Sequence, residues 1–349
     1  MIKPYEFRGH GYRTLAEAVA WTNLRSEPAL EPELPIIDPH HHVWDDQRGR
    51  YLIHELSADV NGGHNIIATV FVEAGVMYRN YGPEEMKPVG EVEFVNGVAA
   101  AGASGHYGKT RLCAGIVGHA DLMLGDKVQP VLDALVAAGN GRFKGIRYGT
   151  IWDSGKAAQF GRHQVARHLM LDPVFRKGFA RLAASKLSFE AWMFYPQLDD
   201  LTDLLRAFPE ANVILNHCGG LLGIPPHDGK RDEVFKIWHA HMRNLAQFPN
   251  LSVKIGGLGM LYCDWDFHLR EMPPSSEDLA ATWRPYVEAI IELFGPARGM
   301  MESNFPPDRQ SCGYGELWNA MKRITKGCSA ADKAALYRDT AARVYRLEV

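Results

Sequence analysis

The stretch Ile36-Ile37-Asp38-Pro39-His40-His41-His42-Val43-Trp44 joins an apolar run to three consecutive histidines. Short apolar runs that end at turn residues are typical of buried strands. We predict the first strand over 35–38. Seven further runs of the same kind follow it, at Ile66–Glu73, Leu112–Val117, Phe143–Tyr148, Leu187–Phe194, Ala211–Asn216, Leu251–Ile255 and Gly299–Glu302.

Helical stretches separate many of these strands. They lie at Gly90–Ala103, Lys127–Ala138, Asp172–Lys186, Leu198–Phe208, Asp232–Phe248 and Asp278–Phe294, with two more at Tyr314–Thr325 and Ala330–Tyr345. Strands that alternate with helices indicate parallel βα units, and eight units predict a single (β/α)₈ TIM barrel of the α/β class. A doubly wound open sheet is the alternative, but no G-x-G-x-x-G motif follows the first strand.

The chain of 349 residues divides into an N-terminal extension, 1–34, and a barrel with C-terminal helices, 35–349. In the extension, Thr14 and Glu17 form the capping-box pattern of a helix that runs through Trp21. The prolines that follow end this helix. The sequence leaves open whether the extension packs across the bottom of the barrel or serves a subunit interface.

The composition excludes several classes of protein. With 38 basic and 41 acidic residues the net charge is −3, which argues against a nucleic-acid-binding face. No apolar stretch is long enough to span a membrane, and the N-terminus lacks the pattern of a secretory signal. The five cysteines are scattered without a C-x-x-C pair, so we expect reduced thiols and a cytoplasmic location. The expected partner is a small-molecule substrate, and a homo-oligomer is the base-rate expectation.

In a (β/α)₈ barrel, functional side chains lie at the carboxyl ends of the strands. His40 and His42 are two residues apart, so both imidazoles share one face of the first strand and can point into the mouth. His41 then points outward and has a structural role. His217 follows the sixth strand directly, before a Gly-Gly turn, and is a third inward imidazole. Neutral imidazole serves as a metal ligand and as an acid or base.

The other strand ends supply further candidates. Glu302 and Asn304 follow the eighth strand, and Asn304 can form hydrogen bonds but cannot act as a general base. Arg147 ends the fourth strand and is suited to binding a carboxylate. The remaining candidates for substrate binding are Glu73, His119, Tyr195, Gln197 and His268. Each of them can equally be structural, and Lys254 could pair with Glu73 in the core.

Three motifs carry a resemblance to a known family. D-P-H-H-H-V-W at 38–44, L-N-H-C-G-G at 215–220 and E-S-N-F-P at 302–306 resemble the amidohydrolase-related family, a group of (β/α)₈ barrels in the amidohydrolase superfamily. The similarity covers 35–347 and is greatest to the branch of sugar lactonases and 2-pyrone-4,6-dicarboxylate lactonase. It implies a lactonase-like hydrolase with either one divalent metal, zinc, held by His40, His42 and His217, or a metal-free site.

Two departures from the family pattern matter for the chemistry. Asn304 stands where the family has aspartate, and Tyr195 stands where relatives often have histidine before a P-Q-L segment. These departures remove a metal ligand or base, so a binuclear metal site is not expected.

The predicted reaction is hydrolysis of a small lactone that carries carboxylate or hydroxyl groups. Arg147 would hold an anionic group, while His40 and His42 would polarise the carbonyl or bind the metal. His217 would assist proton transfer, and Asn304 would orient water. Glu302, Glu73 or a metal-bound hydroxide would replace the missing base. The alternatives are a non-oxidative decarboxylase or hydratase of an aromatic-derived acid, and a barrel that binds a ligand without catalysis.

Overall fold

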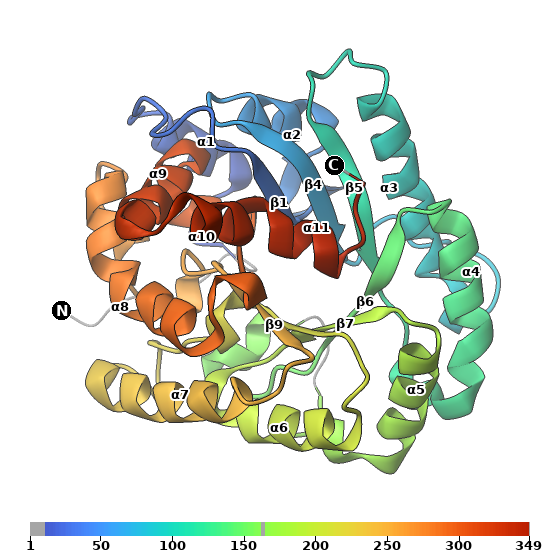
Figure 1. Ribbon diagram of the computed structural model, residues 1–349. Coiled ribbons are helices and arrows are strands. Elements are labelled where there is room, and N and C mark those ends of the chain that lie inside the picture. Colours follow the sequence, from blue (N-terminus) through green and yellow to red (C-terminus); the bar gives the residue numbers. More distant parts are fainter. Residues whose placement is uncertain (1–10, 162–164, 349) are drawn as a thin grey trace.

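The computed structural model describes residues 11–161 and 165–348, and it shows eight parallel strands curled into a barrel with helices outside (Figure 1). The strand order is β1-β4-β5-β6-β7-β8-β9-β10, so every strand lies beside its neighbour in sequence. The fold prediction is therefore confirmed. The strands are β1 (Ile36–His41), β4 (Ile66–Val72), β5 (Arg111–Gly118), β6 (Phe143–Gly149), β7 (Ser188–Trp192), β8 (Val213–Leu215), β9 (Leu251–Ile255) and β10 (Gly299–Met301).

The barrel closes between β1 and the chain that follows β10. Asn304 N donates to His40 O at 2.9 Å, and His42 N donates to Phe305 O at 2.8 Å. The Asp38 carboxylate reinforces the joint, because it accepts from Ser303 N at 3.1 Å and from Ser303 Oγ at 2.6 Å. Burial raises the pKa of Asp38 to about 6. Closure thus places the histidine motif and the E-S-N-F-P motif side by side.

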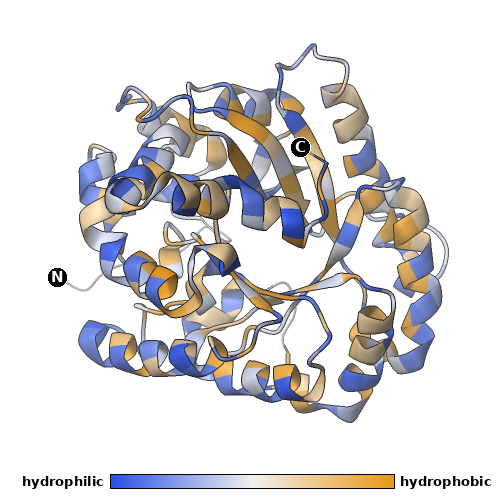
Figure 2. Ribbon diagram, in the orientation of Figure 1, coloured by the Kyte–Doolittle hydropathy of each residue, from blue (hydrophilic) through white to orange (hydrophobic). Residues whose placement is uncertain are grey.

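Amphipathic helices cover the outside of the barrel. Figure 2 shows apolar residues along the strands and on the helix faces that pack against them. Local signals set the helix starts: Asp172 caps α5 ahead of a proline, and Ser275 caps α8 with Asp278 in a capping box. The helices are α3 (Val89–Gly102), α4 (Gln129–Gly139), α5 (Pro173–Ala184), α6 (Leu198–Ala207), α7 (Arg231–Leu245), α8 (Ser276–Phe294) and α9 (Tyr314–Ile324).

Three elements after β1 were not predicted. The chain leaves the barrel mouth in a hairpin of β2 (Trp44–Asp46) and β3 (Gly49–Tyr51), then forms α2 (Ile53–Val60). Gly49 has φ +107, a backbone conformation that favours glycine and closes the turn. Unlike β8 and β10, which are equally short, β2 and β3 have the sequences Trp-Asp-Asp and Gly-Arg-Tyr and therefore contain no apolar run.

The C-terminal helix differs from the prediction because it is interrupted. The predicted helix over Ala330–Tyr345 consists of α10 (Ala330–Ala334), a wider turn over Ala335–Asp339 and α11 (Thr340–Val344). The apolar face of α11 packs on residues at the start of the strands, among them Ile37 and Ala68. This segment therefore covers the bottom of the barrel.

The described part of the extension lies elsewhere, at the mouth and along α9. The predicted capping box is present, since Thr14 caps α1 (Leu15–Thr22) together with Glu17. Further along, Leu30 N donates to Asn319 Oδ1 at 2.7 Å, and Lys322 Nζ donates to Leu30 O at 2.7 Å. Residues 1–10 of the predicted extension lie outside the described residues.

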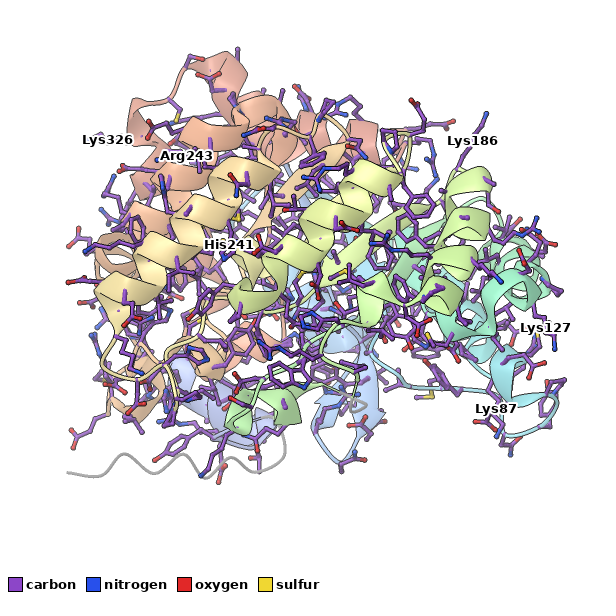
Figure 3. The ribbon with its side chains drawn as sticks, turned by 90° about the horizontal axis from the view of Figure 1, so that it is seen from below. Lys87, Lys127, Lys186, His241, Arg243 and Lys326 are labelled. Atoms are coloured by element: carbon purple, nitrogen blue, oxygen red, sulfur yellow. The ribbon has the colours of Figure 1, made fainter. Side chains whose placement is uncertain are left out.

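Figure 3 shows basic side chains on the outside of the barrel. Lys87, Lys127, Lys186 and Arg243 lie on separate outer elements. All five cysteines are free thiols. Within 11–161 and 165–348, no helix is both long and apolar enough to cross a membrane.

Candidate active site

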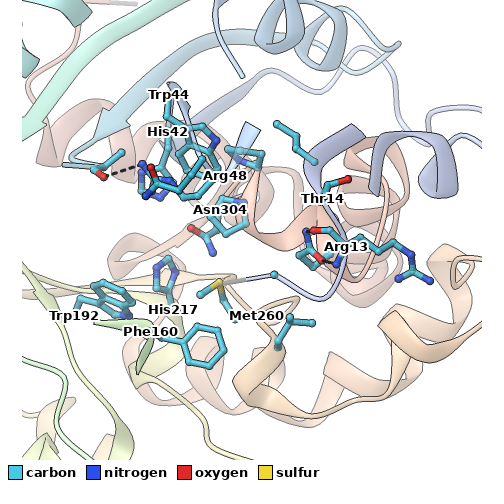
Figure 4. Close-up of a pocket in the computed structure, with 18 of the residues that line it drawn as sticks. Arg13, Thr14, His42, Trp44, Arg48, Phe160, Trp192, His217, Met260 and Asn304 are labelled. Carbon is cyan, nitrogen blue, oxygen red and sulfur yellow. Dashed lines mark hydrogen bonds between the residues drawn. The ribbon is translucent and has the colours of Figure 1, made fainter. Parts of the chain in front are cut away.

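A pocket of about 1120 Å³, including its open mouth, lies at the carboxyl ends of the strands (Figure 4). Four residues predicted from the sequence line it: His42, Arg147, His217 and Asn304. His40 and Glu302 lie directly beneath and are fully buried. The structure therefore brings six predicted residues, from four strand ends, into one cluster.

Glu302 connects two of the histidines. His217 Nδ1 lies 2.8 Å from Glu302 Oε1, and His40 Nδ1 lies 2.9 Å from Oε2. A proton on Nδ1 of His217 therefore points at the carboxylate, which leaves Nε2 of this pocket-lining ring as the acceptor. Gly257 makes room for this arrangement, because a Cβ there would lie 2.3 Å from His217 Nδ1.

His217 and Asn304 both adopt left-handed backbone conformations, with φ 51 and φ 54. Such conformations cost of order 1 kcal/mol or more in non-glycine residues and cluster at functional sites. Asn304 is further fixed by buried Asp308, which accepts from its Nδ2 at 2.7 Å and from Gly259 N at 2.8 Å. Burial raises the pKa of Asp308. The amide oxygen of Asn304 is the part left to meet a ligand.

Arg147 is held rigidly at the base of the pocket. Its Nε donates to Glu73 Oε1 at 2.8 Å and its Nη2 to Glu73 O at 2.6 Å, while Nη1 lies 3.3 Å from His40 Nε2. The guanidinium also lies over the Trp192 ring, 4.8 Å from its centroid. A fixed cation of this kind can bind an anion or an oxygen that gains negative charge.

The two remaining histidines of the motif face in different directions. His42 lines the pocket, and its Nδ1 lies 2.7 Å from Val72 O, which assigns the proton to Nδ1 and leaves Nε2 as an acceptor. Burial and Arg147 lower the pKa of His42. His41 Nε2 instead meets Thr69 Oγ1 at 2.9 Å in the core.

Lys254 pairs with Glu190 and not with Glu73. Its Nζ lies 2.6 Å from Glu190 Oε2 and 3.3 Å from His40 Nδ1, and burial lowers the pKa of Lys254. The pKa of His40 is also lowered, by burial first and then by Lys254. His40 is thus kept neutral between two cationic side chains.

The other predicted substrate-binding residues do not line this pocket. His119 and Glu73 line a smaller cavity that Trp192 also lines. Tyr195 bonds to His227, and Gln197 is engaged by backbone groups of 150, 152 and 194. His268 packs edge-on against Tyr12. Their assignment to the substrate stays a prediction that these placements do not favour.

Several lining residues were missed. Trp44 and Arg48 come from the unpredicted hairpin, and Phe160 and Met260 come from loops without periodic patterns. Leu15 and Arg13 come from the extension, held there because Tyr12 N and Arg13 N both donate to Gln310 Oε1, at 3.0 and 2.9 Å. The hydrophilic turn directly after the histidine motif is the feature of the sequence that could have indicated Arg48 as a lining residue.

One cluster of buried side chains has the donor types that hold divalent metals. Among the described residues, one group has donors close enough, within 4.8 Å of one another: His40, His217 and Glu302. His42, which the sequence placed in the set, is not part of it. Both nitrogens of His40 lie 3.3 Å from a cationic nitrogen, of Arg147 or of Lys254. These two cations are each paired with a carboxylate of their own, Glu73 for Arg147 and Glu190 for Lys254. The charge of Glu302 is therefore left for an ion, and His40, His217 and Glu302 are the residues that would hold it.

The sequence model of the family described as "Amidohydrolase" matches residues 37–347. The chain belongs to this amidohydrolase family. The match spans all eight strands and both site motifs, and the family is one of hydrolases that act on small molecules. The resemblance that the motifs indicated is thereby confirmed.

Three relatives set this member in context. Protein y4mH of Sinorhizobium fredii is 32% identical over 90% of this chain and 99% of its own. L-Fucono-1,5-lactonase of Burkholderia multivorans is 25% identical over 89% of this chain and 96% of its own. A Burkholderia multivorans amidohydrolase, solved with bound zinc, superimposes with TM-score 0.68 at 24% identity, over 90% of this chain and 99% of its own.

Proposed function

We propose that this amidohydrolase hydrolyses the ester bond of a lactone without a metal. The main support is the pair of His217 and Glu302, in which Nδ1 lies 2.8 Å from Oε1. This pair supplies the general base that Asn304 cannot supply. The relative named as a lactonase supports the substrate class. The reaction needs a polarised carbonyl, an activated water and a proton for the departing ring oxygen.

The first step forms a carbon–oxygen bond. His217 Nε2 takes a proton from water while the water oxygen attacks the lactone carbonyl, and Glu302 stabilises the imidazolium through Nδ1. Asn304 accepts the second hydrogen of the water through its amide oxygen. The carbonyl carbon becomes tetrahedral, and its electron pair moves to the former carbonyl oxygen.

That oxygen carries the new negative charge, and Arg147 is the donor that stabilises it at the base of the pocket. Because the guanidinium is already held by Glu73, it needs no reorganisation during the reaction. In the second step the tetrahedral species collapses and the ring ester bond breaks. The His217 imidazolium returns its proton to the leaving alkoxide, which gives a hydroxy acid and restores the neutral site.

A panel of lactones tests the proposal with three proteins: wild type, His217→Ala and Glu302→Gln. General acid–base groups contribute typically 10²–10⁴-fold, so we expect kcat to fall by about that factor in His217→Ala. Wild-type turnover should persist after dialysis against a chelator and in protein free of metal by elemental analysis. Unchanged turnover in His217→Ala would remove the proposed base, and loss of activity with the chelator, restored by zinc, would remove the metal-free mechanism.

A further inference from the structure

One wall of the pocket is rich in hydrogen-bond donors. Trp44 and Arg48 from the β2–β3 hairpin form it, and Arg147 lines the same pocket at its base. The Trp44 indole Nε1 is buried and meets no partner among the described residues, and the side chain as a whole is 6% exposed. Buried indole N–H groups without a partner in the described part of the chain also occur at Trp192, Trp283 and Trp318, so this donor adds to the polar character of the wall and does not by itself identify a ligand.

Arg48 and Arg147 are anchored on adjacent carbonyls just after the end of β4. Arg48 Nη2 donates to Ala74 O at 3.2 Å (Figure 4), and Arg147 Nη2 donates to Glu73 O at 2.6 Å. The Arg48 guanidinium lies over the Trp44 ring, 4.1 Å from its centroid. Asp46 accepts from its Nε and Nη2, so Nη1 remains, within the described contacts, for a ligand.

The facing wall carries apolar side chains next to His217 (Figure 4). Figure 4 shows Phe160 and Met260 across the pocket from Trp44 and Arg48. Phe160 is fixed edge-on against the buried Tyr262 ring. The other apolar residues of the lining are Leu15, Leu261, Pro306 and Pro307. These side chains have no group that could bond the hydroxyls of a sugar ring, and such hydroxyls would lose their hydrogen bonds to water there.

We infer that the substrate is an amphipathic lactone, with a carboxylate on one side and a hydrocarbon or aryl substituent on the other. The carboxylate lies between Arg48 Nη1 and the Trp44 indole, while the carbonyl faces Arg147 and the apolar substituent contacts Phe160 and Met260. This substrate class rests on the proposed lactonase activity. It differs from a polyhydroxylated sugar lactone, whose hydroxyls would need donors and acceptors where Phe160 and Met260 lie.

The test compares three lactones of equal ring size: one with a carboxylate and a phenyl group, its methyl ester, and a polyhydroxylated sugar lactone. We expect the highest kcat/KM for the first. Arg48→Gln should raise its KM about tenfold and leave the KM of the methyl ester within twofold. Arg50→Gln is the matched control, because Arg50 is on the same hairpin but pairs with Glu55 and does not line the pocket.

Met260→Ser probes the wall opposite Arg48. It should raise the KM of the phenyl-substituted lactone several-fold more than the KM of the same lactone without the phenyl group. Calorimetry with the corresponding lactams measures binding without ester hydrolysis. It therefore tests the amphipathic ligand class independently of the lactonase activity. Lactam binding that depends on Arg48 and Met260 without turnover of any lactone refutes the lactonase but keeps the amphipathic ligand. A sugar lactone with the highest kcat/KM, or equal effects of Arg48→Gln on the acid and its ester, overturns the inference.

Discussion

The base and the rim of the pocket are built in different ways. The base consists of side chains at strand ends, and its charged members are buried and paired, as Arg147 is with Glu73 and Lys254 with Glu190. The rim consists of irregular segments: the extension, the hairpin and loops. The base has one arrangement because each charge depends on its neighbour, whereas rim residues can change without disturbing the barrel. We therefore expect substitutions in the base to affect stability and turnover, and substitutions in the rim to affect KM.

The largest effect is expected from Lys254→Met. This change leaves Glu190 as an uncompensated charge in the barrel, and breaking a buried pair in this way costs about 3–5 kcal/mol. Unfolding in urea measures the loss. Lys87→Met breaks the exposed pair with Glu84 and should cost about 1 kcal/mol or less. The double variant Lys254→Met/Glu190→Gln should regain part of the stability, and equal losses in the single and double variants would contradict the reasoning.

A pH-dependent effect is expected where the extension meets α9. Burial, and then Lys322, lowers the pKa of His64 to about 4, whereas an unfolded histidine titrates near ~6.5. Between these values the unfolded chain binds a proton that the folded chain does not, so the free energy of unfolding falls as the pH falls from 6.5 to 4. At about 1.4 kcal/mol per pKa unit the loss is roughly 3 kcal/mol.

His64→Gln isolates this contribution, because glutamine keeps an acceptor for Lys322 and a donor for Gly315 O but takes up no proton. Chemical denaturation at pH 7 and pH 4 should show a smaller loss of stability in the variant than in wild type. The exposed His106→Gln serves as the control. Identical pH dependence of wild type and His64→Gln would show that His64 is not kept neutral by its surroundings.

Gly257→Ala tests the geometry at the bottom of the pocket by adding a single methyl group. The new Cβ would lie 2.3 Å from His217 Nδ1, so the imidazole must move, and a displacement of about 1 Å can cost on the order of 10²-fold in rate. Gly295→Ala is the matched control, since Gly295 also has a positive φ, +72 against +63, but open space around it. If both variants retain kcat after correction for folded fraction, the position of His217 does not control the reaction.

The same division explains how much the sequence revealed. Periodic strands and strand-end motifs predicted the barrel and the cluster of His40, Arg147, His217 and Glu302, because strand direction fixes where such residues point. The partner of Lys254 could not be predicted, since the choice between Glu73 and Glu190 depends on which strands face each other across the barrel. The rim was missed because its members, such as Arg48, lie in segments without a periodic pattern.

Gln310→Ala tests whether the extension belongs to the pocket. The Gln310 amide accepts from Tyr12 N and Arg13 N and donates to Arg13 O at 2.9 Å, so its loss releases the segment that carries Leu15 into the lining. Net values of about 1 kcal/mol per hydrogen bond predict a several-fold rise in KM. We expect kcat to stay within twofold, because His217 and Glu302 are untouched. The control is Gln129→Ala, which removes an exposed amide bonded to Asp133. A fall in kcat at unchanged KM would show that the extension acts on the residues at the bottom of the pocket. The rule that rim substitutions change KM and leave kcat unchanged would then be wrong.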